Sequence, residues 1–214
     1  MLSFLAVHPK RTKVAHLQTL SFDDGASSIE FKAPSDRYLV INRWPPAASE
    51  EQTMPGKAQC ALSPRLHWHR YQTERFHVLA GTARFTLERE QILAKAGEIV
   101  NIPVGAFHTF CNASTTERME IEFTLEPLTR KRDEAFFRNL QTYRDDTRKA
   151  GMRPSWPQIL LFMRKGDTFL ALPGPKVIAK PLAVLIHFVG GVVIGKWLLG
   201  YSDTYPEYSH PSTE

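Results

Sequence analysis

The chain has 214 residues, of which 43% are hydrophobic and 23% are charged, and its formal net charge is +5. This length suits one ordinary domain with extensions, long enough to bury a proper core, and the balance is that of a globular protein. Much of the positive excess lies between Arg130 and Arg153, which hold eight Lys or Arg against four Asp or Glu. No nucleic-acid motif accompanies this run, so we interpret it as a solvated helix face and exclude nucleic acid as a partner.

Cysteine use and the first residues indicate the compartment. The sequence holds two cysteines, Cys60 and Cys111, which are too few for a disulfide framework and are typical of a reducing interior. Residues 1–8 are briefly apolar but lack the basic leader and the length of a signal peptide. We therefore expect an intracellular protein, either cytoplasmic or associated with a membrane.

An N-terminal arm is predicted over residues 1–28, with one or two strands that end at the turn signal Asp23-Asp24-Gly25. A β-rich domain is predicted over residues 29–128. A loop rich in proline and small residues, 44–56, interrupts this domain early and is placed to rim a binding pocket.

The β-rich domain reads as short runs of β-type residues separated by turns, without a helical period. Regular short strands of this kind favour an all-β sandwich or a small barrel. The expected strands are 29–31, 37–42, 59–69, 74–80, 83–88, 98–102, 107–112 and 118–125.

A helical extension is predicted over residues 129–214. Its first helix begins at Thr129, because acidic residues occupy the first turn and apolar residues then recur at helical spacing, and it stops at Gly151. A shorter helix is expected from Trp156 to Lys165.

The last feature is an apolar helix predicted over residues 181–200, interrupted only by His187 and Lys196. Gly191 and Gly195 form a small-residue spacing that allows close contact between helices. The length is borderline for crossing a membrane. Two interpretations stay open: a helix buried against the barrel or in a dimer contact, and a helix in contact with a membrane.

Four residues form the best-spaced metal-ligand set in the sequence: His67, His69, Glu74 and His108. In an extended strand, residues i and i+2 point to the same face, so His67 and His69 can share one ion. Glu74 is far enough along the chain to offer a carboxylate from the next strand. Imidazoles with one carboxylate suit first-row transition metals.

The spacing around these residues resembles the two-part signature of the cupin superfamily. The first part is His67-x-His69, four residues, Glu74, six residues and Gly81; the second is Gly97, five residues, Pro103-x-Gly105, two residues, His108, three residues and Asn112. The glycine that usually opens the first part is replaced by Ala61. The resemblance implies a single all-β jelly-roll (cupin) barrel with a C-terminal helical extension, and the pairing of two chains into a homodimer.

Side chains with the same strand parity as the ligands are predicted to line the cavity above the ion. Arg65 shares the face of His67 and His69, where it could clamp a carboxylate or phenolate group of the substrate. Arg65 and Glu74 are therefore the candidate catalytic residues. His77 has the opposite parity and is expected at the surface or in a dimer contact. The expected pocket residues are Phe76, Val78, Phe85, Phe110 and Asn112.

Three functions are compatible with this site. The first hypothesis is a metal-dependent oxygenase acting on a small aromatic or polyketide-like substrate, with iron as the expected metal and zinc, manganese, nickel or copper as alternatives. The second is a non-redox isomerase, cyclase or decarboxylase that uses the ion as a Lewis acid. The third is a metal-stabilised protein that binds a small molecule without catalysis.

Overall fold

The chain divides into two compact units. The computed structural model describes residues 2–54 and 56–209. The barrel unit comprises Gln18–Arg130, and the helical unit comprises Met1–Leu17 with Lys131–Glu214. Part of the predicted arm therefore belongs with the helices, and the rest, from Gln18 on, belongs with the strands.

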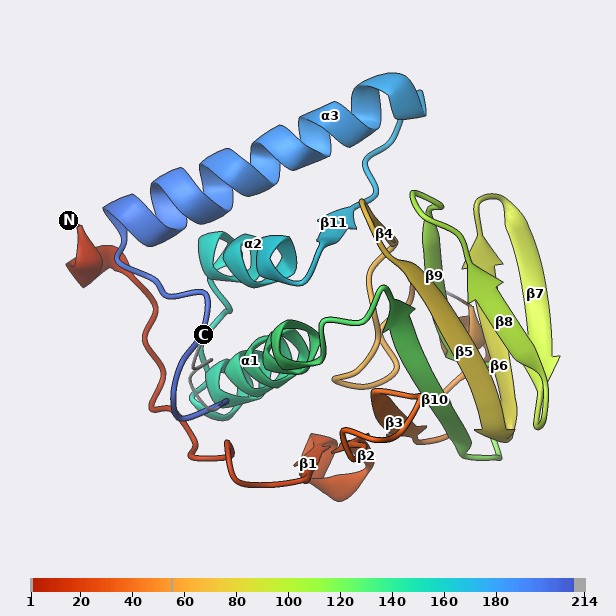
Figure 1. Ribbon diagram of the computed structural model, residues 1–214. Coiled ribbons are helices and arrows are strands. Elements are labelled where there is room, and N and C mark those ends of the chain that lie inside the picture. The colour runs from red at the N-terminus through yellow and green to blue at the C-terminus, as the bar shows by residue number, and fades with distance from the viewer. Residues whose placement is uncertain (1, 55, 210–214) are drawn as a thin grey trace. The chain divides into compact units, whose positions relative to one another are not determined.

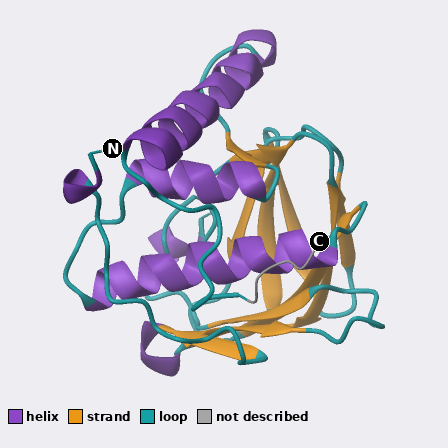
Figure 2. Cartoon of the chain, turned by 60° about the vertical axis from the view of Figure 1, so that its left-hand side comes forward, coloured by secondary structure: helices purple, strands orange, loops and turns teal. Residues whose placement is uncertain are grey.

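The barrel unit is a jelly roll of two antiparallel sheets that curve around a common interior (Figures 1 and 2). One sheet has the order β1-β2-β3-β10-β5-β8, and the other contains β4-β9-β6-β7. The all-β jelly-roll fold predicted from the sequence is confirmed. The strands are β1 (Thr19–Phe22), β2 (Ser27–Phe31), β3 (Val40–Trp44), β4 (His67–His69), β5 (Thr73–Ala80), β6 (Thr82–Leu87), β7 (Glu90–Lys95), β8 (Ile99–Ile102), β9 (His108–Asn112) and β10 (Met119–Glu126).

Alternation along the strands places large apolar rings inside the barrel unit. On β5, Phe76 and Val78 are fully buried, whereas the residues between and beside them are only half-buried. The ring of Phe76 lies 5.2 Å from that of Phe85 and 5.0 Å from that of Phe110, and Trp44 lies 5.3 Å from Phe110. Such ring separations are typical of a packed aromatic cluster.

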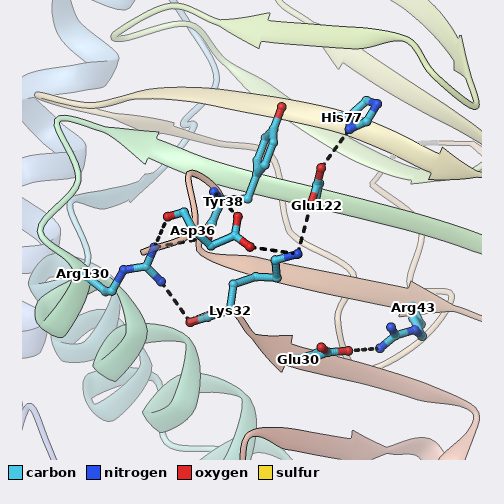
Figure 3. Close-up of polar contacts among 8 residues, drawn as sticks. All are labelled: Glu30, Lys32, Asp36, Tyr38, Arg43, His77, Glu122 and Arg130. Carbon is cyan, nitrogen blue, oxygen red and sulfur yellow. Dashed lines mark hydrogen bonds and ion pairs between the residues drawn. The ribbon is translucent and has the colours of Figure 1, made fainter. Parts of the chain in front are cut away.

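The opposite face of the same sheet carries a charged network instead (Figure 3). His77 Nδ1 lies 2.9 Å from the Glu122 carboxylate, and Lys32 Nζ lies 3.7 Å from it. Arg130 donates to the backbone carbonyls of Lys32 and Asp36, which fastens the loop between β2 and β3. His77 thus lies outside the barrel, as its parity predicts.

Two strand predictions near the site were wrong in extent. The strand expected over 59–69 is reduced to His67–His69, because Ser63 Oγ accepts hydrogen bonds from Gln59 N and Cys60 N and folds that segment into a turn. Trp44, which was assigned to a loop, is the last residue of β3. The edge strand β7 was missed because its exposed side chains leave no apolar alternation to detect.

The helical unit contains the predicted helices. They are α1 (Arg130–Lys149), α2 (Trp156–Lys165) and α3 (Lys176–Ile186), and α3 continues as the π-helix η4 (His187–Leu198) (Figure 1). A short strand, β11 (Thr168–Leu170), precedes α3. Three short 3-10 helices complete the chain, η1 (Ser3–Leu5) in this unit and η2 (Asp23–Gly25) and η3 (Glu50–Thr53) in the barrel unit.

Buried polar contacts tie both ends of the described chain to α1. The Asp146 carboxylate accepts hydrogen bonds from Thr12, at 2.9 Å from its backbone nitrogen and 2.6 Å from its hydroxyl, and from the Tyr208 hydroxyl at 2.7 Å. Asn139 lies about two turns earlier on α1, and its side-chain oxygen accepts a hydrogen bond from the backbone nitrogen of Tyr205. These contacts explain why the first residues belong to the helical unit rather than to the barrel unit.

One helix of the described chain meets the length and composition needed to cross a membrane. This is the continuous stretch Lys176–Leu198, and the buried core helices of globular proteins can meet the same two criteria.

Candidate metal centre

Three short strands bring the predicted ligands together. His67 on β4 is directly opposite His108 on β9 in the antiparallel register. His69 projects to the same side as His67 because it lies two residues further along β4. Glu74 is the second residue of β5, which begins after a turn of three residues. The sequence therefore needs only one tight turn and one strand pair to assemble all four side chains.

The four side chains are buried and close enough to share one ion. One ligand atom from each of the four lies within 4.8 Å of all the others. Glu74 Oε2 lies 2.8 Å from His108 Nε2, and Glu74 Oε1 lies 3.4 Å from His69 Nε2. Ligands at about 2.1 Å from a common ion are spaced by roughly 3 to 4 Å, so small side-chain rotations suffice to complete such a site.

Backbone carbonyls fix the tautomer of two of the rings. Nδ1 of His67 lies 2.8 Å from the carbonyl oxygen of Arg65, and Nδ1 of His108 lies 2.9 Å from that of Ala106. A carbonyl oxygen only accepts, so both Nδ1 atoms carry hydrogen and donate it. In the neutral rings this leaves the Nε2 lone pairs of His67 and His108 directed at the centre of the cluster, which is the arrangement that metal-binding histidines use.

Electrostatics favours the metal-binding protonation states. Burial, assisted by the charges of His108 and His69, lowers the pKa of His67 well below its usual value. Burial alone would raise the pKa of the Glu74 carboxyl. The charge of His69 and the hydrogen bonds from both histidines outweigh that effect and hold the pKa well below its usual value. A neutral His67 and an anionic Glu74 are the forms that bind metals. In a metal-loaded site, the bound ion would supply the positive charge that the protonated histidines otherwise place beside Glu74.

The donor set fits a divalent transition metal. Imidazole nitrogens with one carboxylate suit iron, manganese, nickel, copper or zinc, whereas calcium and magnesium prefer oxygen ligands. A carboxylate packed 2.8 Å from an imidazole nitrogen whose partner nitrogen already donates also requires a proton or a cation between them. These four residues are therefore the ones that would hold an ion.

The predicted pocket residues divide into two groups. Phe76 and Phe110 lie two residues beyond Glu74 and His108 on their strands, so the aromatic cluster adjoins the ligand set. Phe85 and Val78 are also fully buried in the interior. In contrast, Asn112 uses its side-chain amide to bind the backbone of the surrounding loops, with hydrogen bonds to Pro45 O, Glu117 O and Ser114 N.

Arg65 is placed differently from the ligands. It precedes β4, its side chain is exposed, and its backbone carbonyl is the group that contacts His67. Because the side chain of Arg65 is exposed, the structure does not support the predicted role of this side chain in clamping a buried substrate. The clearest role of Arg65 in the structure is to orient a ligand through its backbone.

Two interior residues were missed by the sequence analysis. Asn42 and Trp44 lie two positions apart on β3 and are almost completely buried. Among the described residues, Asn42 Oδ1 and Trp44 Nε1 are buried polar atoms without a hydrogen-bond partner. The alternation Val40, Asn42, Trp44 was the available signal, and assigning Trp44 to the following proline-rich loop concealed it.

Known proteins resemble this chain along most of its length. A family model described as a cupin domain matches residues 52–124, which include all four candidate ligands. The chain is 31% identical over 209 residues to "Probable oxidoreductase virH" of Hypocrea virens, covering 96% of this chain and 92% of that protein. It is 28% identical over 213 residues to "Probable oxidoreductase yanE" of Aspergillus niger, covering 93% and 79%. It is 29% identical over 153 residues to "Epoxidase atD" of Aspergillus terreus, covering 68% and 47%.

Proposed function

Because this chain belongs to the cupin superfamily, we propose that it is a metal-dependent oxygenase acting on a small aromatic or polyketide-like molecule. Two similar proteins carry the name oxidoreductase and a third carries the name epoxidase, which supports oxidation as the reaction class. The observation that carries the proposal is the set of four buried ligand atoms within 4.8 Å of one another, adjoining an aromatic interior.

The ligands His67, His69, Glu74 and His108 would hold the ion. When bound, an iron ion supplies Lewis acidity and redox chemistry with dioxygen, and iron is therefore the expected metal. The residues of the chain supply position: the carbonyls of Arg65 and Ala106 orient two imidazoles, and the strand pair β4–β9 fixes their separation.

The interior next to the ligands supports an aromatic substrate. Phe76, Phe85 and Phe110 present ring faces and edges that pack well against another ring. Asn42 Oδ1 needs a hydrogen-bond donor and Trp44 Nε1 needs an acceptor. A substrate hydroxyl could serve either atom, because it can accept from an indole N–H and donate to an amide oxygen. We therefore favour a hydroxylated ring over a plain hydrocarbon.

The test is oxygen dependence. Protein loaded with iron is mixed with a panel of phenols and small aromatic polyketides, and oxygen uptake is followed with an electrode beside product analysis. The proposal predicts uptake with iron, none after anaerobic transfer and none with zinc. Turnover that persists without oxygen and with zinc would instead support an isomerase, cyclase or decarboxylase. Ligand binding without any turnover would support the non-catalytic alternative.

The His77→Ala variant is the matched control for this assay, because His77 is a histidine of the same sheet that lies on its outer face. It should keep the oxygen uptake that His108→Ala loses. The homodimer expected from the resemblance and the intracellular location stay predictions, and the first of them is checked by light scattering on the same samples.

A further inference from the structure

The helix formed by α3 and η4 exposes its largest side chains. Their exposed fractions run from 38% at Ile186 to 80% at Val177. An ordinary surface helix buries such residues and exposes charged ones. We call the exposed set the apolar face. It consists of Val177, Ile178, Leu182, Leu185, Ile186, Phe188, Val189, Ile194, Trp197 and Leu198.

The buried side of this helix consists of residues at a spacing of four, all of them small except His187. A Cβ atom added at Gly191 would lie 2.8 Å from Leu161 N, and one at Gly195 would lie 3.0 Å from Pro157 O. The helix is therefore seated directly on the backbone of α2, which leaves its large side chains on the outside. The buried residues are Ala179, Ala183, His187, Gly191 and Gly195.

The beginning of the chain extends the apolar face. Leu2 N donates to Leu198 O at 2.6 Å, so η1 lies beside the end of η4. Leu2, Phe4 and Leu5 are 41%, 79% and 62% exposed. Two segments from opposite ends of the sequence thus contribute to one apolar surface.

The charges around this surface have one sign. The sequence contains no Asp or Glu in residues 2–22 or 168–202. The basic residues there include Lys10 and Lys13 in the N-terminal arm, Lys176 and Lys180 at the start of the helix, and Lys196 near its end. Lys196 Nζ lies 3.2 Å from the Asp203 carboxylate. The two segments together carry six Lys or Arg and no acidic residue, so the sequence that forms and borders the apolar face is positive.

We propose that the apolar face binds the surface of an anionic lipid bilayer, with the helix lying in the interface. Apolar side chains enter the acyl region while lysines contact acidic headgroups. A spanning helix is disfavoured because Gly191 and Gly195 hold one side of it against α2. A second copy is disfavoured because the helix itself contains three lysines and no acidic residue, so neither parallel nor antiparallel pairing brings opposite charges of two helices together.

Vesicle sedimentation of the full chain tests the proposal. Wild-type protein should pellet with phosphatidylcholine vesicles that contain about a third phosphatidylserine, less with phosphatidylcholine alone, and less in high salt. Leu185→Glu should lower the bound fraction on the anionic vesicles about tenfold, because it places a carboxylate in the apolar face. Leu93→Glu is the matched control, since Leu93 is 56% exposed on β7 and Leu185 is 55% exposed; its binding should equal that of the wild type.

Three results would overturn the proposal. The first is a wild-type protein that stays in the supernatant with both kinds of vesicle. The second is a lipid-independent dimer in light scattering that Leu185→Glu dissociates, which would assign the face to a second copy. The third is protein that resists extraction from the vesicles at alkaline pH, which would assign a spanning helix. Circular dichroism of both variants confirms that each is folded before these results are compared.

Discussion

The two units of this protein distribute apolar and polar side chains in opposite ways. In the barrel unit, aromatic rings fill the interior and four metal-binding groups are buried beside them. In the helical unit, the α3–η4 helix buries glycine and alanine and exposes leucine, isoleucine and tryptophan. The barrel unit thus gathers its functional groups inside, whereas the helical unit presents its distinctive surface outside. Burial alone therefore does not identify the functional residues of this chain.

Removing one buried metal ligand of the barrel unit should have the largest effect on stability. His108→Ala should destabilise the barrel unit by roughly 4 kcal/mol, because it leaves the Glu74 carboxylate buried with one partner fewer. His77→Ala removes a half-buried histidine that pairs with Glu122 and should cost less than about 1 kcal/mol. Urea unfolding of both variants measures the difference. Equal costs would mean that the ligand cluster is not a special buried site.

A buried histidine in the helical unit gives the next largest effect. His187 Nε2 accepts from Leu170 N, and burial, helped by the charge of Arg164, lowers the pKa of His187 to about 4. The unfolded chain binds the proton near pH 6.5 but the folded chain does not, so stability falls as the pH drops from 6.5 towards 4. The expected loss is about 3 kcal/mol over that range.

The variant His187→Gln keeps an acceptor for Leu170 N but cannot take up a proton in this range. Its unfolding free energy, measured from pH 7.5 down to pH 4.5, should therefore show a shallower slope than that of the wild type. Parallel curves for the two proteins would show that other groups, such as the buried carboxylates of α1, account for the whole pH dependence.

Substitutions at two neighbouring glycines test the close packing of the α3–η4 helix against α2. A Cβ at Gly191 meets the Leu160–Leu161 backbone, whereas one at Gly190 meets only the flexible end of the Leu160 side chain, at 2.7 Å. Gly191→Ala should therefore cost about 2 kcal/mol more than Gly190→Ala, because backbone overlap cannot relax by rotation. The gain in helix propensity is the same for both and cancels. Thermal unfolding compares them, and equal stability would argue against the close packing.

The sequence predicted the barrel unit better than the helical unit for a physical reason. His67, His69 and Glu74 are constrained by strand parity and a tight turn, so their spacing alone indicates convergence. The same parity rule places His77 outside. It missed Trp44, because the prolines after it made the whole segment look like a loop.

The helix at 181–200 was harder to interpret because its sequence is apolar on all sides. Periodicity then predicts a helix but not which face is buried. Gly191 and Gly195 decide this in the structure, through close contacts with the backbone of α2 that depend on tertiary packing. The helix was predicted to begin at Pro181, but in the structure it begins at Lys176.

The smallest expected change in stability comes from substituting two buried asparagines of the barrel unit. Asn42→Leu should raise the stability of the protein by about 1 kcal/mol, because it removes a buried carbonyl oxygen that lacks a partner among the described residues. Asn112→Leu should instead lower it, because three hydrogen bonds to loop backbone are lost. Chemical unfolding measures both. A destabilised Asn42→Leu would show that Asn42 supports the fold rather than a ligand.

The most direct test of the metal centre is its metal content. Protein purified without a chelating column is analysed by mass spectrometry for first-row transition metals, alongside His108→Ala and His77→Ala. We predict one transition-metal ion, with iron foremost, for each chain of the wild type and of His77→Ala, and loss of that ion in His108→Ala. Wild-type protein that holds no metal after incubation with each candidate ion, or a His108→Ala variant that binds metal as tightly, would contradict the account.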